Sequence, residues 1–288
     1  MVTAGDRIGR RVIVAWDGSP AASTAVPVAR RIAGQLGAEV EALYVAHDAA
    51  EKEGWQAKLG AEAERLGVSV RLVTGEPSAE IVRATEREGV CLVALTMHGR
   101  DVGEKGHRLG RIAKKVIAST VRPVLLVKPE AAEGKEAGPV RRLLVPIDGT
   151  PKTAAALQPV TQLAHDLKAS IDFLYVADPR QKPPLERGSI TAPRYVDQPQ
   201  HEWPEWANEV MRRLSEGCAG CPEDVEVRIY LGRGDAGEEI THFAREKGSD
   251  AIVLVRRSRF QPGRAKVIRA VLERTTSHVI IVGCGEEA

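Results

Sequence analysis

The sequence contains two copies of one pattern, and this internal repeat limits the possible folds more than any other feature. In each copy an apolar run is followed by Asp-Gly-Ser/Thr-Pro, which begins at Asp17 in the first copy and at Asp148 in the second. Tyr44 and Tyr175 lie in a second pair of matching runs, at the same offset of 131 residues. The chain of 288 residues is therefore expected to form two similar domains in tandem.

The predicted domains are residues 10–129 and residues 140–283. Residues 130–139 between them are rich in Glu, Ala and Gly and show no apolar periodicity, as expected of a linker. The second copy is longer than the first, and we expect most of the added length in an insert at the proline-rich residues 181–204. After its fourth apolar run, however, the second copy is four residues shorter.

Short runs of β-branched and aliphatic residues alternate with amphipathic segments in each copy, a pattern typical of βαβ units. Apolar strands separated by helices form parallel sheets, and right-handed crossovers on both faces make such a sheet doubly wound. Each domain is therefore predicted to be α/β and Rossmann-like. In the first copy the predicted strands are residues 11–15, 39–45, 69–73, 91–95 and 124–127, and the predicted helices are residues 21–36, 55–66, 78–88 and 109–119.

Five residues mark the ends of these predicted helices. Ser19 and Ser78 lie where the N-caps of the first and third helices are expected. Gly37, Gly67 and Gly89 directly follow helical segments, as C-terminal glycine caps do.

Composition argues against several classes of protein. The net charge of +2 gives no general attraction to nucleic acid or to an anionic membrane. No apolar run approaches the roughly 18 residues of a membrane span, and residues 1–11 lack the apolar segment of a secretory signal. The expected location is the cytoplasm. Aromatic residues make up only 4% of the chain, so both cores are expected to consist of Val, Ile, Leu and Ala.

Polar and glycine-rich segments follow the predicted strands at the edge where α/β sheets bind ligands. Asp17-Gly18-Ser19 follows the first strand, Gly75-Glu76-Pro77 the third, and Met97-His98-Gly99-Arg100 the fourth. In this order the three segments resemble the universal stress protein family. The resemblance implies a five-stranded parallel sheet of order 3-2-1-4-5 in each domain. It also implies that the fifth strands, residues 123–128 and 278–282, pair within the chain and make it an intrachain pseudo-dimer.

Some members of this family bind ATP, so the resemblance implies an adenine-nucleotide site in the first domain, with Mg²⁺ as the accompanying ion. Glycines let backbone N–H groups approach phosphate oxygens at a helix N-terminus. Asp17 would face the adenosine, and Ala15 and Val45 would line the adenine slot. The expected cofactor-binding residues are Ala15, Asp17, Gly18, Ser19, Val45, Thr96, Met97, His98, Gly99, Arg100, Gly110, Arg111 and Ile112.

The glycine loop of the first copy departs from the family pattern. Thr96 occupies the position of the first glycine, ten residues rather than nine separate Gly99 from Gly110, and Arg111 replaces a Ser or Thr. Two interpretations remain open. Either the loop holds phosphates in a variant geometry with Arg111 as a charged donor, or the fold has lost its ligand. In the second case Asp17 only satisfies the donors of its own turn.

The second copy matches the pattern poorly. Residues 255–259, Val-Arg-Arg-Ser-Arg, replace the glycine segment, and the loop is shorter. We therefore expect no ATP to bind there. The arginines are expected to form a solvated basic face, with a site for a smaller anion as the alternative.

Two further features have no assigned role. Tyr195, Trp203 and Trp206, beside the prolines of the insert, could form a surface for a protein partner or a second copy, or a loop that covers its own domain. Cys218 and Cys221 form a single Cys-x-x-Cys without a second ligand pair nearby. No metal site is predicted.

Three functions are compatible with these features. The first is a regulatory protein of the stress type that senses an adenine nucleotide through one working site. The second is a nucleotide-independent scaffold that acts through protein partners, and the third is a slow ATPase. The sequence contains no Gly-x-x-x-x-Gly-Lys-Ser/Thr loop and no Gly-x-Ser-x-Gly elbow, so no catalytic residue is assigned and the chain is not expected to be an enzyme.

Overall fold

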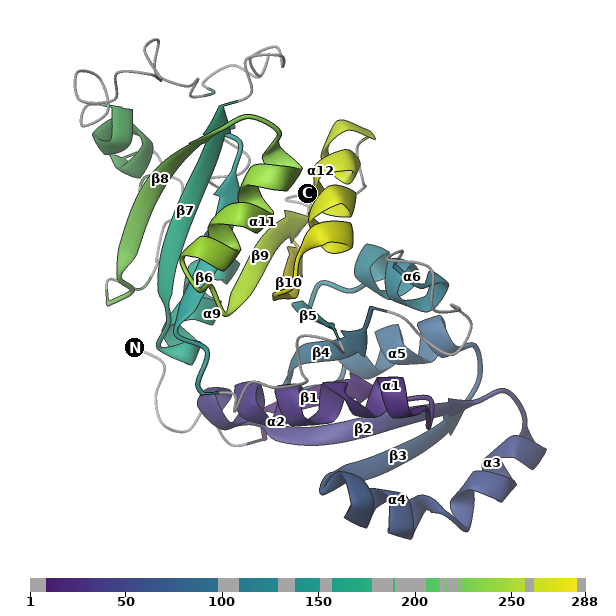
Figure 1. Ribbon diagram of the computed structural model, residues 1–288. Helices are drawn as coiled ribbons and strands as arrows, with labels where there is room; N and C mark the ends of the chain where they lie inside the picture. Colours follow the sequence, from purple (N-terminus) through teal and green to yellow (C-terminus); the bar gives the residue numbers. More distant parts are fainter. Residues whose placement is uncertain are drawn as a thin grey trace. The chain divides into compact units, whose positions relative to one another are not determined.

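The computed structural model describes residues 9–97, 109–128, 138–150, 157–177, 189, 206–212, 216, 222, 224–256 and 262–283, without the side chains of residues 262–265. The chain divides into two compact units (Figure 1). The first unit extends to Pro139 and also contains the last strand, which begins at His278. The second unit extends from Val140 to Ser277.

The sheet of the first unit has the strand order β3-β2-β1-β4-β5-β10. Strands β1 to β5 are parallel, which confirms the predicted 3-2-1-4-5 order. Strand β10 pairs antiparallel with β5, with Val279 opposite Leu126, so the predicted pairing of residues 123–128 with 278–282 is also confirmed. The strands are β1 (Arg11–Ala15), β2 (Glu39–Ala46), β3 (Ser69–Thr74), β4 (Val90–Thr96), β5 (Val124–Val127) and β10 (His278–Gly283).

Helices cover both faces of this sheet. Helix α2 packs on β1, β2 and β4, and helix α5 packs on the same three strands and on α6. Because the chain moves outward from β1 to β2 through α2 and returns from β3 to β4 through α5, right-handed crossovers place these helices on opposite faces. The helices are α1 (Pro20–Ser23), α2 (Ala25–Leu36), α3 (Ala49–Gln56), α4 (Leu59–Leu66), α5 (Pro77–Thr85) and α6 (Arg111–Ser119).

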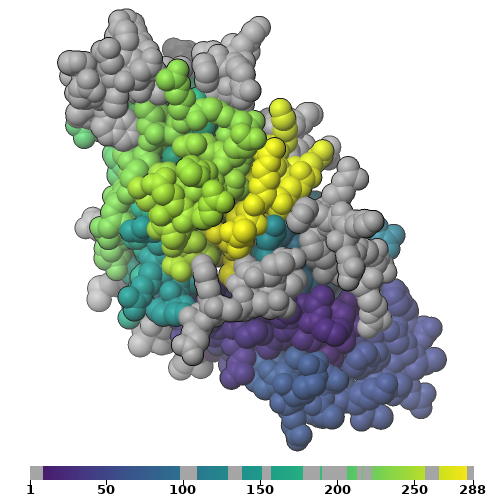
Figure 2. Space-filling model, in the orientation of Figure 1, coloured from purple at the N-terminus to yellow at the C-terminus, as the bar shows by residue number. Residues whose placement is uncertain are grey.

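The second unit repeats the start of this topology in the order β9-β6-β7-β8, all parallel. Helices α11 and α12 lie side by side at its surface (Figure 2). Gly237 of α11 faces Ala270 of α12. A Cβ on Gly237 would lie 2.5 Å from the Ala270 side chain, so glycine permits this close approach. The elements are β6 (Arg142–Ile147), β7 (Ser170–Ala177), β8 (Val227–Arg233), β9 (Ala251–Arg256), α9 (Leu157–Leu167), α11 (Ala236–Glu246) and α12 (Pro262–Arg274).

Two predicted helices of the first copy are each divided in the structure. The segment predicted as one helix over residues 21–36 is α1 followed by α2, with Thr24 between them. Pro27 explains this break, because its ring would clash with the Ser23 carbonyl in a continuous helix. The segment predicted as one helix over residues 55–66 is the end of α3 followed by α4.

The cap predictions were right at three positions and wrong at two. Ser19 caps α1, and Gly37 and Gly67 are left-handed C-caps of α2 and α4. Helix α5, however, ends earlier than predicted, with Glu86 and not Gly89 as its C-cap, and its N-cap is Glu76 and not Ser78. The carboxylate of Glu76 accepts the Ala79 N–H at 2.8 Å, and Pro77 then occupies the first helical position.

Candidate functional site

The carboxyl ends of β1, β2 and β4 bring several predicted site residues to one edge of the first sheet. Ala15 lies opposite Leu43 on β2, and Val45 is two residues beyond Leu43 on the same face. Ala15 and Val45 are both half-buried, whereas the three residues directly before Ala15, residues 12–14, are fully buried. This face of the edge therefore leaves two small apolar side chains accessible, as a slot for an aromatic ring requires.

The Asp-Gly-Ser turn after β1 is held by its own side chains. One oxygen of the Asp17 carboxylate accepts the Ser19 N–H at 2.9 Å, and Gly18 has a φ of 78°. The Ser19 hydroxyl accepts the Ala22 N–H at 3.1 Å and thereby caps α1. Asp17 thus makes the hydrogen bond within its turn that a structural residue would make. Its half-buried carboxylate also lies at the carboxyl edge of the sheet, where a ligand could reach it.

The segment after β4 is joined to the start of α6. The Gly110 N–H donates to the Met97 carbonyl at 3.1 Å, and the Met97 N–H donates to the Val127 carbonyl at 3.0 Å. Gly110 is the N-cap of α6 and has no side chain to accept the first-turn N–H groups. Arg111 is exposed and Ile112 half-buried directly behind it. The N-terminus of α6 therefore reaches the carboxyl edge of β4.

Of the remaining predicted site residues, Thr96 and Met97 are described by the structure. Thr96 is almost buried and Met97 completely so, which means that neither side chain is freely available to a ligand. Met97 contributes to this edge through its backbone. His98, Gly99 and Arg100 lie outside the described residues, as do the predicted insert and most of the linker.

Glu76 is a charged residue at this edge to which the sequence pattern gave no role of its own. Its carboxylate accepts the Ser78 hydroxyl at 2.5 Å and lies 3.3 Å from the Lys115 ammonium of α6. The hydrogen bond from Ser78, followed by that from the Ala79 N–H, lowers the pKa of Glu76 to about 2. The Glu76 side chain, 53% exposed, is thus held ionised and links α5 to α6.

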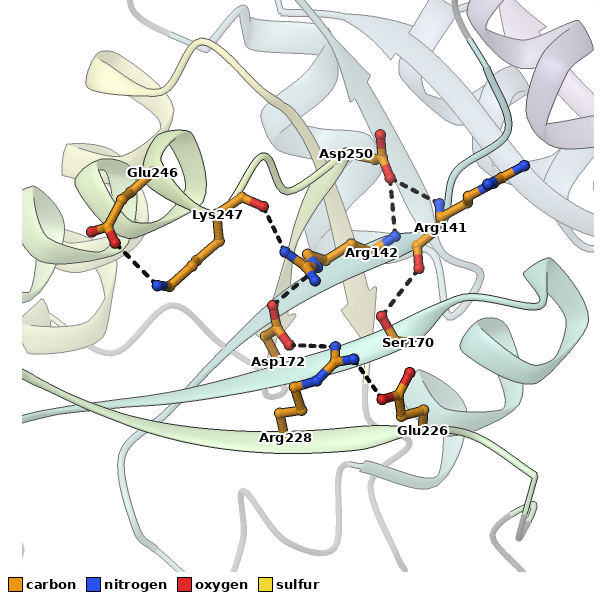
Figure 3. Close-up of polar contacts among 9 residues, drawn as sticks. All are labelled: Arg141, Arg142, Ser170, Asp172, Glu226, Arg228, Glu246, Lys247 and Asp250. Carbon is orange, nitrogen blue, oxygen red and sulfur yellow. Dashed lines mark hydrogen bonds and ion pairs between the residues drawn. The ribbon is translucent and has the colours of Figure 1, made fainter.

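A second polar cluster lies at the opposite, amino edge of the second sheet (Figure 3). Asp172 of β7 is completely buried between Arg142 of β6, at 3.5 Å, and Arg228 of β8, at 3.6 Å. Arg142 also donates to the Lys247 carbonyl at 2.7 Å, and Arg228 pairs with Glu226. The two arginines balance the charge of Asp172, although both of its carboxylate oxygens are buried without a hydrogen bond from any residue that the structure describes. The cluster thereby joins three neighbouring strands through ion pairs.

The turn of the second unit has the same geometry as that of the first. Asp148 accepts the Thr150 N–H at 3.1 Å, and Gly149 has a φ of 71°. At the end of β9, Arg256 occupies the position of Met97 in the repeat and is only 8% exposed. The expectation of a solvated basic face is therefore wrong for Arg256, whose strand position places it in the buried layer of the sheet. Arg257 and Arg259 lie outside the described residues.

Trp206 packs on its own unit. Its side chain is 9% exposed, and its ring lies edge-on to Tyr175 of β7 with centroids 5.3 Å apart. Of the two interpretations of this segment, the structure favours for Trp206 the one in which the chain covers its own domain. Trp203 and Tyr195 lie outside the described residues.

Two other features are absent from the part of the chain that the structure describes. None of the helices there is long and apolar enough to cross a membrane. The same residues contain no group of three or more His, Cys, Asp or Glu side chains placed to hold a metal ion.

Comparison with known proteins gives a consistent family assignment. A universal stress protein of Methanocaldococcus jannaschii is 28% identical over 150 residues, which cover 45% of this chain and 88% of the relative. A second such protein from this organism is 38% identical over 69 residues, covering 23% of this chain and 42% of the relative. The crystal structure of a universal stress protein from Archaeoglobus fulgidus has the same fold, with a TM-score of 0.61 at 16% identity, covering 98% of this chain and 99% of that one.

The description of the universal stress protein family matches both halves of the chain separately, at residues 46–128 and 139–283. The second match spans the second repeat, and the first spans the part of the first repeat from the end of β2 onward. The chain belongs to the universal stress protein family, with two family domains in tandem.

Proposed function

We propose that this protein is a regulatory protein that binds ATP in its first domain, residues 10–129, and binds no nucleotide in its second, residues 140–283. The adenine would lie in the slot beside Ala15 and Val45, and Asp17 would face the ribose. The phosphates would lie at the N-terminus of α6, accompanied by Mg²⁺. Such a protein would act in the cytoplasm, where ATP is abundant.

The observation that carries this proposal is the hydrogen bond between the Gly110 N–H and the Met97 carbonyl. It holds the uncapped start of α6 beside the end of β4, next to the strand that bears the Asp17 turn. A helix N-terminus concentrates free N–H groups and partial positive charge, both of which suit a phosphate. The exposed guanidinium of Arg111, the first residue of α6, would add a charged donor.

The proposal for the second domain rests on what occupies the same edge. Arg256 is buried where the first domain has Met97. A triphosphate needs glycines there that allow backbone N–H groups to approach closely, and the shorter, arginine-rich segment retains only Gly263. The shared Asp-Gly turn alone is not sufficient, because both units build it with the same hydrogen bond.

The matched variants Asp17→Ala and Asp148→Ala test this assignment. Both remove the acceptor of the turn, so both are expected to destabilise their own unit to a similar extent. Only Asp17→Ala is expected to weaken ATP binding, by about tenfold or more, since it also removes a ligand contact. Equilibrium binding of ATP, ADP and AMP to protein freed of co-purified nucleotide is the measurement.

The variant Asp17→Asn separates the two roles of Asp17. Asparagine keeps an oxygen that can accept the Ser19 N–H, so the turn and the thermal stability should be retained. Weaker ATP binding by this variant would assign the carboxylate to the ligand. Equal affinities for ATP in the wild type, Asp17→Ala and Asp17→Asn would show that Asp17 does not contact the nucleotide. No binding of any adenine nucleotide at millimolar concentration would leave a scaffold that acts through protein partners.

A further inference from the structure

Three aromatic side chains of the first unit form a cluster next to the Asp17 turn. Trp16 directly precedes Asp17, Tyr44 lies near the end of β2, and Trp55 belongs to α3. Their ring centroids are 5.9 Å apart for Trp16 and Tyr44, 5.4 Å for Trp16 and Trp55, and 4.3 Å for Tyr44 and Trp55. Trp16 and Tyr44 are buried, whereas Trp55 is half-buried, so the cluster is covered from outside by α3.

Helix α3 depends on this cluster for its place on the unit. None of its eight residues is buried, and a helix of this length is not stable in water by itself. The helix packs on β2 and β3. Besides the contacts of Trp55, the carboxylate of Glu51 accepts the Tyr44 hydroxyl at 2.6 Å and the His47 N–H at 2.7 Å. Two side chains of α3 therefore hold it to Tyr44 of β2.

Trp16 connects the same cluster to the turn after β1. Its indole N–H donates to the Ser23 hydroxyl at 3.1 Å, and that hydroxyl donates to the Ser19 carbonyl at 3.0 Å. Arg65 of α4 also donates to the Ser23 hydroxyl, at 3.3 Å. One side chain thus packs against α3 and, through Ser23, fixes the residues that shape the proposed nucleotide site.

The second unit keeps only part of this arrangement. Tyr175 corresponds to Tyr44 and is packed by a tryptophan, Trp206, in a similar edge-on contact. The residue that corresponds to Trp16, however, is Ile147, which has no N–H to hold the turn. The connection from the aromatic cluster to the turn is therefore found in the unit for which we propose a working site.

We infer that Trp16 is a positioning residue that couples the docking of α3 to nucleotide binding at the Asp17 turn. This inference rests on the proposed function. Docked α3 holds Trp16, and Trp16 holds the turn in the geometry that the nucleotide needs. Since coupling between two equilibria is reciprocal, a bound nucleotide strengthens the docking of α3 and makes this surface helix a readout of site occupancy.

The test compares three variants of the full chain in α3. Trp55→Ala removes the ring that contacts Trp16 and Tyr44, Trp55→Phe keeps an aromatic ring, and Gln56→Ala changes an exposed neighbour as the control. Trp55→Ala is expected to weaken ATP binding by about threefold to tenfold, the range that an aromatic contact supports. Trp55→Phe should recover most of this loss, and Gln56→Ala should bind as the wild type does.

Hydrogen exchange followed by mass spectrometry gives a second measurement, in which protection of α3 by ATP is the change that a merely structural role of Trp16 would not produce. ATP is expected to slow exchange in residues 49–56 of the wild type, and Trp55→Ala is expected to speed exchange in residues 16–24 even without ATP. ATP binding with unchanged affinity in Trp55→Ala and no protection of α3 would overturn the inference but leave the proposed function intact. A wild type that binds no nucleotide would refute both, since the coupling requires a ligand.

Discussion

The two units share their amino edge and differ at their carboxyl edge. Both units have an acid on the second strand of the repeat, each beside an arginine from the start of the first strand: Glu41 is largely buried in the first unit, and Asp172 is fully buried in the second. These pairs keep the offset of 131 residues. At the carboxyl edge, by contrast, Met97 corresponds to Arg256 and Trp16 to Ile147. The comparison indicates that the amino edge serves the framework and that the carboxyl edge is where function diverged.

Each of these acids also contacts a second arginine, and this arginine comes from a different element in each unit. Glu41 pairs with Arg87, which lies after α5, whereas Asp172 lies near Arg228 of β8. Glu41 is 13% exposed and Asp172 is not exposed at all. In both units a second arginine therefore helps to neutralise the acid, although it comes from a different position. This is expected of an acid that has to be neutralised within the fold but has no ligand to recognise.

The largest expected effect on stability is at this shared framework. Asp172→Ala leaves two arginines without their buried acid and should lower the free energy of unfolding by about 3 kcal/mol. Glu41→Ala should cost about 1 kcal/mol, since water reaches its pair more easily. Urea unfolding measures both. Glu226→Ala, an exposed partner of Arg228, serves as the control with almost no effect, and equal losses in all three variants would contradict the comparison.

The next effect concerns the carboxyl edge of the first unit. Gly110→Val places two methyl groups at the start of α6 and should weaken ATP binding by about tenfold, because they obstruct the approach of a phosphate. Gly110 has a φ of −60°, and a Cβ there would meet the Met97 carbonyl at an ordinary 3.7 Å. Gly110→Ala should therefore fold normally and bind more tightly than the valine variant. Calorimetric titration with ATP measures the affinities of both variants and the wild type. Equal affinities in all three would show that the phosphates do not bind at the start of α6.

The smallest expected effect is on acid stability through the cap of α5. The pKa of Glu76 is lowered to about 2 from its ordinary value of 4.5, so its contribution is present above pH 4.5 and is lost as the pH falls toward 2. Because the side chain is more than half exposed, we expect only about 0.5–1 kcal/mol. Glu76→Gln should reduce stability at pH 7 and flatten its fall below pH 4.5, as thermal unfolding would show. If stability fell with pH below 4.5 as steeply in Glu76→Gln as in the wild type, the negative charge of Glu76 would make no contribution to stability.

Sequence reasoning predicted the strands and the residues at their ends because parallel strands are apolar throughout and their turns use glycine and aspartate. The strand order, by contrast, followed only from the resemblance to the family. It failed where one residue overrules a pattern. Pro27 divided a predicted helix, although proline is itself a visible signal. Glu76 rather than Ser78 caps α5, which Pro77 at the first helical position indicates in retrospect.

The aromatic cluster could not have been predicted from spacing. Trp16, Tyr44 and Trp55 come from a strand end, a neighbouring strand and a short helix, and they meet only because the β1 and β2 register and the docking of α3 bring them together. Likewise, a solvated face was expected for the arginines of the second copy, since arginine is mostly exposed. The position of Arg256 within β9 buries it instead.

The central claim is that the two carboxyl edges differ in function, and the number of nucleotides bound per chain tests it most directly. Calorimetric titration of nucleotide-free protein with ATP and Mg²⁺ should give one site per chain. That site should be weakened in Asp17→Ala and retained in Asp148→Ala. Two sites per chain, or one site that survives Asp17→Ala and is lost in Asp148→Ala, would contradict the assignment of function to the first unit.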